Sequence, residues 1–238
     1  MPTLSVVIAS MNEEEGIGEC LDAILKAFQT HKIDGEIVLA DNSEDTTPRI
    51  ARSHGAKVVT PDKLGYGHAL IYGIDNSSGN YVIVGDADGT YDFSNLDMFL
   101  VPLMNDEVDV VIGSRFRGMI KKGAMPWLHR YIGNPLLTFG LNAKLGTHLS
   151  DAHCGLRSFT REIWNKIDHK YIPDDFCSEM LKQVTIANAR IAEIPIIYYP
   201  RKGKVKANTL VHGWRCFSFL TFKILLSKAV RQSKERVK

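Results

Sequence analysis

The sequence of 238 residues has few cysteines and none in a paired motif. Cys20, Cys154, Cys177 and Cys216 lie far apart, without CxxC or the mixed Cys/His spacing of a zinc site. This pattern counts against a small disulfide-stapled scaffold. It predicts reduced, structural thiols in an intracellular protein.

Long apolar runs are also lacking. The first residues, MPTLSVVIASMNEEE, have neither the basic start nor the long apolar segment of a signal peptide. No window contains 18 uninterrupted apolar residues, so we expect no membrane-spanning helix and a cytoplasmic location. The sequence has no GxxxxGK[ST], which counts against P-loop chemistry, and no GxSxG nucleophile elbow.

Charge of one sign is scarce in each half of the chain. Residues 1–110 contain 6 Lys+Arg and 19 Asp+Glu, a balance of −13, whereas residues 111–238 contain 23 and 8, a balance of +15. One interpretation is simply solvated faces. The other is a division of labour, with functional carboxylates in the first half and cations for phosphate or a membrane in the second.

The first half alternates between short apolar runs and helical patterns. Strands are expected over residues 4–9, 36–40, 57–60, 81–85 and 108–113. Helices are expected from an N-cap at Asn12 to about residue 28, and over 46–53, 66–77 and 94–105. Continuously apolar strands separated by helices predict an α/β fold with a mostly parallel sheet covered on both faces.

The second half is less regular. Helices are expected over residues 127–145, 158–167 and 176–188. Residues 190–199 are expected to form a strand that Pro195 restricts to an edge or a bulge. No repeat, linker or low-complexity segment divides the chain.

The stretch YVIVGDADGTYDF places two carboxylates, Asp86 and Asp88, at the end of an apolar strand. Side chains at i and i+2 of an extended segment point to the same side, so the two charges repel unless a cation lies near them. Mg²⁺ or Mn²⁺ suits such a pair together with substrate phosphates. The plainer alternative is an acidic turn at a strand end.

Basic residues gather in two late segments. The loop YPRKGKVKANT contains Arg201 and Lys206, and RFRGMIKKGAMPWLHR runs from Arg115 to Arg130. Each of these two segments is either a solvated basic loop or a loop that closes over phosphate groups. Residues 211–238 are apolar and then basic, which is typical of an amphipathic helix at a lipid interface, although a core helix with a basic tail has the same composition.

Several segments, taken in order, resemble family 2 glycosyltransferases of the GT-A fold. They are LSVVIASMNEEEGIGECLDAI, EIVLADNSEDTT, KLGYGHAL, YVIVGDADGTY and VIGSRF. DAHCGLRSF, FCSEML, IAEIPIIYYPRKGKVK and HGWRCFSFL resemble later blocks of the subgroup that makes polyprenyl- or dolichyl-phosphate sugars. The resemblance covers about residues 4–222.

The resemblance implies roles for individual residues. Nucleotide-binding residues would be Ala9, Ser10, Asn12, Glu13, Asp41 and Asp86. A Mg²⁺ or Mn²⁺ ion would be held by Asp86 and Asp88. Catalytic residues would be Asp88, Arg115, Arg130 and Arg201, and Arg201 and Lys206 would bind the acceptor.

The expected activity is a metal-dependent, inverting hexosyltransferase, with a catalytic domain at residues 1–210 and an interfacial helix at 211–238. The donor would be GDP-mannose or a UDP-sugar and the acceptor a polyprenyl phosphate. The alternative acceptor is a sugar hydroxyl of a polysaccharide or glycolipid, for which Glu179 is the candidate base. Relatives often carry transmembrane helices beyond this point, so contact with the cytoplasmic membrane face is expected to be peripheral. No nucleic-acid partner is expected, and homo-oligomerisation stays open.

Overall fold

The computed structural model describes residues 2–170, 172 and 175–203. Within them one sheet has the strand order β3-β2-β1-β4-β6-β5-β7. The strands are β1 Leu4–Ser10, β2 Gly35–Asp41, β3 Lys57–Val59, β4 Tyr81–Asp86, β5 Val110–Ile120, β6 Arg157–Thr160 and β7 Ile191–Tyr198. All neighbouring pairs are parallel except those of β6, which is antiparallel to both β4 and β5. The predicted mostly parallel α/β sheet is confirmed.

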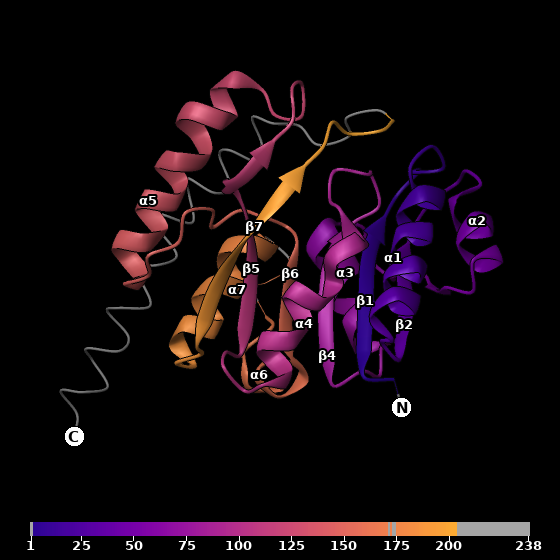
Figure 1. The fold of residues 1–238 in the computed structure, drawn as a ribbon, viewed down its shortest axis with the longest axis horizontal. Helices are drawn as coiled ribbons and strands as arrows, with labels where there is room; N and C mark the ends of the chain where they lie inside the picture. The colour runs from indigo at the N-terminus through magenta and orange to yellow at the C-terminus, as the bar shows by residue number, and fades with distance from the viewer. Residues whose placement is uncertain (1, 171, 173–174, 204–238) are drawn as a thin grey trace.

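Helices flank this sheet (Figure 1). They are α1 Ile17–His31, α2 Thr47–Ser53, α3 Tyr66–Asp75, α4 Leu96–Met104, α5 Asn134–Leu145, α6 Arg161–Lys166 and α7 Phe176–Ile186. A short 3₁₀ turn, η1 (Phe93–Asn95), precedes α4, and a π-helical turn, η2 (His129–Gly133), leads into α5. In α1 the buried residues Ile17, Leu21 and Ile24 recur every three or four positions, so one apolar stripe faces the core.

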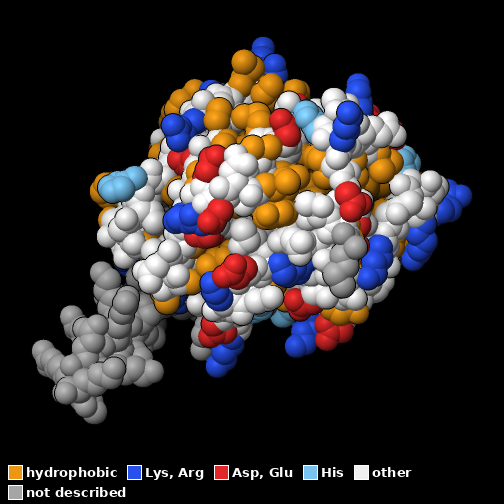
Figure 2. Space-filling view, turned by 60° about the horizontal axis from the view of Figure 1, so that its bottom comes forward, with side chains coloured by type: hydrophobic (Ala, Val, Ile, Leu, Met, Phe, Trp, Pro, Cys, Tyr) orange, Lys and Arg blue, Asp and Glu red, His pale blue; other side chains and the backbone are white. Residues whose placement is uncertain are grey.

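The core is apolar, whereas the surface is mixed. The central strands β1 and β4 are almost entirely buried. On the face drawn in Figure 2, acidic and basic side chains lie among the hydrophobic ones, so that face carries charges of both signs. The edge position predicted for the strand containing Pro195 is confirmed, because β7 is the last strand of the sheet and pairs with β5 alone.

Two predictions about local structure are wrong. Residues 158–167 do not form one helix, because β6 first fills the gap between β4 and β5, and α6 begins only at Arg161. Asn12 does not cap α1, which begins five residues later. Its backbone has φ +56° and its side-chain oxygen accepts from the Glu44 backbone N–H at 2.9 Å, so the side chain is used elsewhere.

Arg157 is a buried cation that holds a loop against the sheet. Its guanidinium donates to the carbonyl oxygens of Ala152 at 2.6 Å, Cys154 at 2.8 Å and Cys177 at 2.8 Å. These bonds tie the 152–154 loop and the start of α7 to β6. Arg157 is only 1% exposed, so its removal takes away three hydrogen bonds in a buried region.

We predict that Arg157→Met lowers the free energy of unfolding by at least ~3 kcal/mol, because hydrogen bonds from a buried cation are lost together. Urea denaturation followed by circular dichroism measures this loss. Arg190→Met is the matched control, since Arg190 pairs with Asp106 and Asp109 at the surface. Equal losses in the two variants would contradict the assigned role of Arg157.

Candidate active site

The predicted site residues meet at the carboxyl ends of three neighbouring strands. Ser10 ends β1, Asp41 ends β2 and Asp86 ends β4. The strand order reverses at β1, which has β2 on one side and β4 on the other. Ligands of open α/β sheets bind outside the carboxyl ends of the strands at such a switch point.

Asp86 and Asp88 form a carboxylate pair with little access to water. Asp88 is 7% exposed, and burial raises the pKa of Asp86 to about 7, with the charge of Asp88 adding to the effect. A hydrogen bond with the Tyr66 side chain acts in the opposite direction. The pair therefore needs a nearby positive charge to be ionised fully.

Arg201 supplies a positive charge at this pair. Its Nη1 donates to Oδ2 of Asp88 at 2.9 Å, and its Nη2 donates to Glu13. The other carboxylate oxygen of Asp88 accepts from the backbone N–H and the hydroxyl of Thr90, at 3.0 and 2.6 Å. Arg201 thus lies where a cation is favoured, 113 positions from Asp88 along the chain.

These residues fit a divalent ion. The Arg201 guanidinium already bridges the carboxylates of Glu13 and Asp88. Carboxylate oxygens are ligands that suit Mg²⁺ and Mn²⁺. Among the described residues no group of three or more His, Cys, Asp or Glu is arranged to hold a metal. If such an ion binds here, the Asp86–Asp88 pair would be the protein's share of the site, and substrate phosphates would supply further oxygens.

The loop around Arg201 is tied to the turn that carries the carboxylates. The backbone N–H of Lys202 donates to the Asp88 carbonyl at 2.9 Å, and that of Tyr199 donates to the Thr90 carbonyl at 2.9 Å. The Lys202 ammonium pairs with Glu19 on α1. On the other side, a Cβ at Gly16 would lie 2.9 Å from the Ala87 carbonyl oxygen, so only glycine lets α1 start this close.

The residues predicted to bind the nucleotide lie together beside this pair. The buried Asp41 carboxylate accepts from the hydroxyls of Ser10 and Ser43, the latter at 2.5 Å. The backbone N–H of Asn12 donates to the Ser43 hydroxyl at 2.6 Å. Ala9 pairs with Asp86 in the β1–β4 register, which puts it next to the carboxylates.

Two tyrosine hydroxyls that sequence reasoning missed converge near Asp86. A Cβ built at Gly155 would lie 3.0 Å from the Tyr91 hydroxyl, 3.2 Å from the Tyr66 hydroxyl and 3.3 Å from Oδ2 of Asp86. The Gly155 backbone N–H also donates to the Tyr91 hydroxyl at 2.8 Å. The glycine of DAHCGLRSF was a signal for such a close approach, but the sequence does not identify the groups that it meets.

Arg115 is held by a carboxylate to which the sequence analysis gave no role. Its Nε and Nη2 donate to the two oxygens of Asp151 at 2.6 and 2.7 Å, and its guanidinium carbon lies 5.3 Å from the Tyr198 ring centroid. Tyr198 in turn lies 5.5 Å from Tyr91, ring to ring. Arg115 is therefore oriented firmly, beside the tyrosines rather than on the carboxylate pair.

Of the remaining candidates, the structure describes only Arg130. Arg130 is in η2, where its guanidinium carbon lies 5.4 Å from the Tyr131 ring centroid. No carboxylate in the described part of the chain pairs with it. Lys206 and the predicted helix at 211–238 lie outside the described residues.

Glu179 is enclosed within α7. Its side chain is fully buried, and its Oε2 accepts from the ammonium of Lys182 at 3.1 Å. Lys182 is itself 7% exposed. A carboxylate in this position is poorly suited to take a proton from an incoming hydroxyl.

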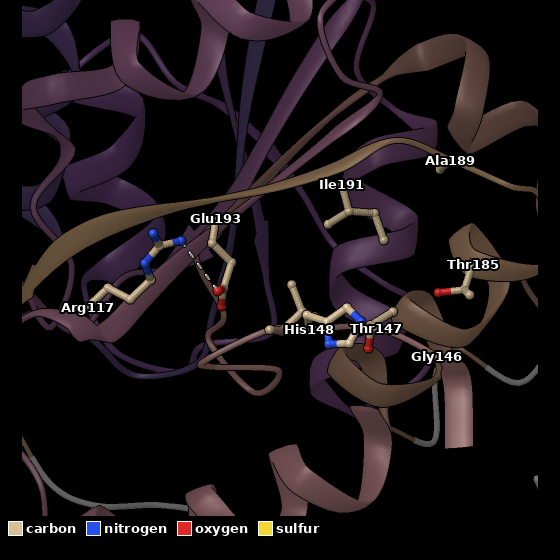
Figure 3. A pocket seen from close by; sticks show the side chains of 9 residues that line it. Arg117, Gly146, Thr147, His148, Thr185, Ala189, Ile191 and Glu193 are labelled. Carbon is tan, nitrogen blue, oxygen red and sulfur yellow. Dashed lines mark ion pairs between the residues drawn. The ribbon is translucent and has the colours of Figure 1, made fainter. Parts of the chain in front are cut away.

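A separate cavity of about 430 Å³ lies between the loop after α5, the end of α7 and β7 (Figure 3). Arg117 and Glu193 point toward one another across it, 3.8 Å apart, and His148 faces them from the loop. No predicted site residue lines this cavity. Glu193 also accepts from the backbone N–H groups of Ser150 and Asp151, so it anchors the segment that holds Arg115.

Comparison with known proteins agrees with this geometry. The family model described as Glycosyl transferase family 2 matches residues 5–168. The chain belongs to this family, and its sheet and flanking helices have the GT-A fold. No helix among the described residues is long and apolar enough to cross a membrane.

Two relatives come from Haloferax volcanii. The low-salt glycan biosynthesis hexosyltransferase Agl6 is 42% identical over 92% of this chain, and the chain spans about half of that protein, 53% of its length. A dolichyl-phosphate hexose transferase is 35% identical over 88% of this chain and 89% of its own length. Glucosyl-3-phosphoglycerate synthase from Mycobacterium tuberculosis, crystallised with Mn²⁺, UDP-glucose and phosphoglyceric acid, superposes with a TM-score of 0.67 at 21% identity, covering 95% of this chain and 79% of that one.

His153 gives the site region a dependence of stability on pH. Burial lowers the pKa of His153 to about 4. Its Nδ1 is buried and has no hydrogen-bond partner among the described residues, and its Nε2 lies 3.1 Å from the Ser178 hydroxyl. Between pH 6.5 and 4 the unfolded chain therefore binds a proton that the folded chain excludes. Stability is present above pH 6.5 and is lost as the pH falls.

We predict that the free energy of unfolding falls by about 1–2 kcal/mol more in the wild-type protein than in His153→Gln between pH 6.5 and 4.5. Urea titrations at several pH values measure the two slopes. His54→Gln is the control, because His54 is a partly exposed histidine beside Asp22. Parallel curves for wild type and His153→Gln would show that the folded protein accommodates the imidazolium.

Proposed function

We propose that this chain is an inverting, metal-dependent hexosyltransferase. It transfers a sugar from a nucleotide-diphosphate donor, GDP-mannose or a UDP-sugar, to a polyprenyl phosphate. Family membership and the hexosyltransferase relatives support the reaction class. The relative named dolichyl-phosphate hexose transferase supports the acceptor, and the neighbour crystallised with Mn²⁺ and UDP-glucose supports the metal and the type of donor.

One observation carries the proposal: the Asp86–Asp88 pair at the switch point, where the pKa of Asp86 is raised and the guanidinium of Arg201 pairs with Asp88. A nucleotide-sugar donor leaves as a diphosphate that gains negative charge. A divalent ion at Asp86 and Asp88 would act as a Lewis acid for that charge. Asp86 and Asp88 would hold this ion at the carboxyl end of β4.

The roles of the surrounding residues follow from their contacts. Ser10, Asn12, Glu13 and Asp41 form the walls on which we place the nucleoside. Arg115 uses two of its nitrogens on Asp151, which leaves the Nη1 edge for a phosphate oxygen. Arg130, Arg201 and Lys206 are the proposed further cations for phosphate groups.

A phosphate acceptor matches the burial of Glu179, the candidate base. A phosphate monoester is mostly dianionic at neutral pH, so its oxygen attacks the anomeric carbon without losing a proton first. The new C–O bond forms as the bond to the donor diphosphate breaks, with inversion at that carbon. A hydroxyl acceptor would need a base, and the burial of Glu179 against Lys182 argues against this residue.

The remaining parts of the proposal concern location. We place the catalytic domain at residues 1–210 and a lipid-interfacial segment at 211–238, so that the enzyme works on the cytoplasmic membrane face. A polyprenyl acceptor requires such contact, because its tail stays in the bilayer while its phosphate enters the site.

We predict that Asp88→Asn lowers transfer from the preferred donor to a polyprenyl phosphate by at least ~10³-fold, because the transition-state charge loses its stabilising ion. A panel of UDP- and GDP-sugars with Mn²⁺ or Mg²⁺ and radiolabelled product extraction measures it. Calorimetric titration with Mn²⁺ and the nucleoside diphosphate is expected to lose its metal dependence in the same variant. Asp92→Asn is the control, since Asp92 caps η1. An Asp88→Asn enzyme with full, metal-dependent turnover would refute the proposal.

Glu179 separates the two acceptor classes. We predict that Glu179→Gln keeps transfer to polyprenyl phosphate within about tenfold of wild type, because no base is needed. The double variant Glu179→Gln, Lys182→Met controls for the loss of the ion pair between these two side chains. A loss of ~10³-fold in both variants, with unchanged thermal unfolding, would instead assign Glu179 as a base and favour a hydroxyl acceptor.

A further inference from the structure

The helical segment formed by η2 and α5 has an apolar surface that the described part of the chain does not cover. The segment lies at the left-hand edge of the molecule (Figure 1). Large apolar side chains along it are between 46 and 71% exposed: Trp127, Leu128, Tyr131, Ile132, Leu136 and Phe139. We call these six residues the α5 patch.

The α5 patch is a continuous face rather than a set of scattered residues. Leu128, Ile132, Leu136 and Phe139 follow at spacings of four, four and three residues, which places them along one side of the helix. The opposite side, with Thr138 and Leu141, is buried against the fold. Only the side with Thr138 and Leu141 packs against the described part of the fold. The exposed apolar side is therefore a candidate interaction surface.

Charge identifies the occupant of this surface. Residues 110–150 contain six Lys and Arg and no Asp or Glu: Arg115, Arg117, Lys121, Lys122, Arg130 and Lys144. A symmetric dimer through the α5 patch would bring this basic segment against itself. The chain's own residues 201–238 contain 11 Lys and Arg against Glu235 alone, so they too are an unfavourable cover. An anionic surface would attract the Lys and Arg side chains of residues 110–150.

The apolar residues have the chemistry of a lipid interface. Trp127 and Tyr131, with ring centroids 5.8 Å apart, are the aromatic types that favour the headgroup level of a bilayer. Leucine, isoleucine and phenylalanine follow them on the same helix, with lysines just before it, as in helices that lie in the interface plane. With 12 residues, α5 is too short to cross a bilayer.

We propose that the α5 patch docks this protein on an anionic lipid surface, with the helix lying in the plane of the interface. This contact is separate from residues 211–238, which the sequence analysis assigned to the membrane. The inference concerns binding and does not rest on the proposed reaction. The α5 patch is also close in sequence to the candidate active site, because Asp151, which orients Arg115, lies six residues after the end of α5.

The test is co-sedimentation of the full chain with vesicles of phosphatidylcholine alone or with 30% phosphatidylglycerol, without donor or metal. We expect binding to the anionic vesicles and at least a tenfold loss of affinity in Leu136→Ser, Phe139→Ser. The matched control, Leu64→Ser, changes a leucine that is 71% exposed outside α5, and is expected to bind as wild type. Lys121→Glu, Lys122→Glu is expected to weaken binding to anionic vesicles only.

Fluorescence gives a second readout that does not depend on affinity. In a Trp214→Phe background the described tryptophans are Trp127, 66% exposed, and Trp164, 1% exposed, so only Trp127 is accessible to lipid. Brominated lipids are expected to quench its emission on vesicle addition. Unchanged affinity of Leu136→Ser, Phe139→Ser together with unquenched Trp127 would overturn the proposal. A wild-type dimer that this variant converts to a monomer would equally overturn it and assign the patch to a second copy. Failure here would leave the transfer assay unaffected, because vesicle binding is measured without turnover.

Discussion

The repulsion between Asp86 and Asp88 is the constraint on which the rest of the site depends. The end of β4 fixes both carboxylates in a region with little water, where burial disfavours their joint ionisation. A cation relieves this cost. In this structure the guanidinium of Arg201 reaches across from the loop after β7 and bonds to Asp88 and Glu13. Arg201 and its partners Glu13 and Asp88 lie far apart in the sequence, and the folded sheet brings them together.

This contact links the fold to the proposed chemistry. Under the proposed function, a divalent ion at the pair would compete with Arg201 for Asp88, and the guanidinium would then be available to a phosphate group. The same loop is tied by backbone hydrogen bonds to the turn that carries Asp88. Arg115 is arranged differently, because its bidentate contact with Asp151 orients the guanidinium beside the tyrosines. In this structure the two arginines of the site are thus paired with different carboxylates.

The sequence predicts those parts of the molecule that local pattern encodes. The apolar runs of β1, β2 and β4 and the i, i+2 spacing of Asp86 and Asp88 are local, and the resemblance to a glycosyltransferase family rested on such segments. Residues 158–167 were predicted as one helix, whereas the first of them form β6 because they pair with both β4 and β5, which lie elsewhere in the sequence. The pairs Arg201–Asp88 and Arg115–Asp151 span 113 and 36 positions, so no local pattern indicates them. The exposure of the apolar side of α5 could not be predicted either. The sequence of an apolar helix does not indicate whether one or two of its sides are covered by the rest of the fold.

The most direct test of the central claim is a crystal structure of the protein with Mn²⁺ and a nucleoside diphosphate, using the anomalous signal of manganese to locate the ion. The account predicts a manganese peak bonded to a carboxylate oxygen of Asp88, with the Arg201 guanidinium withdrawn from that oxygen. Manganese bound elsewhere, or Arg201 still paired with Asp88 in the loaded site, would contradict it.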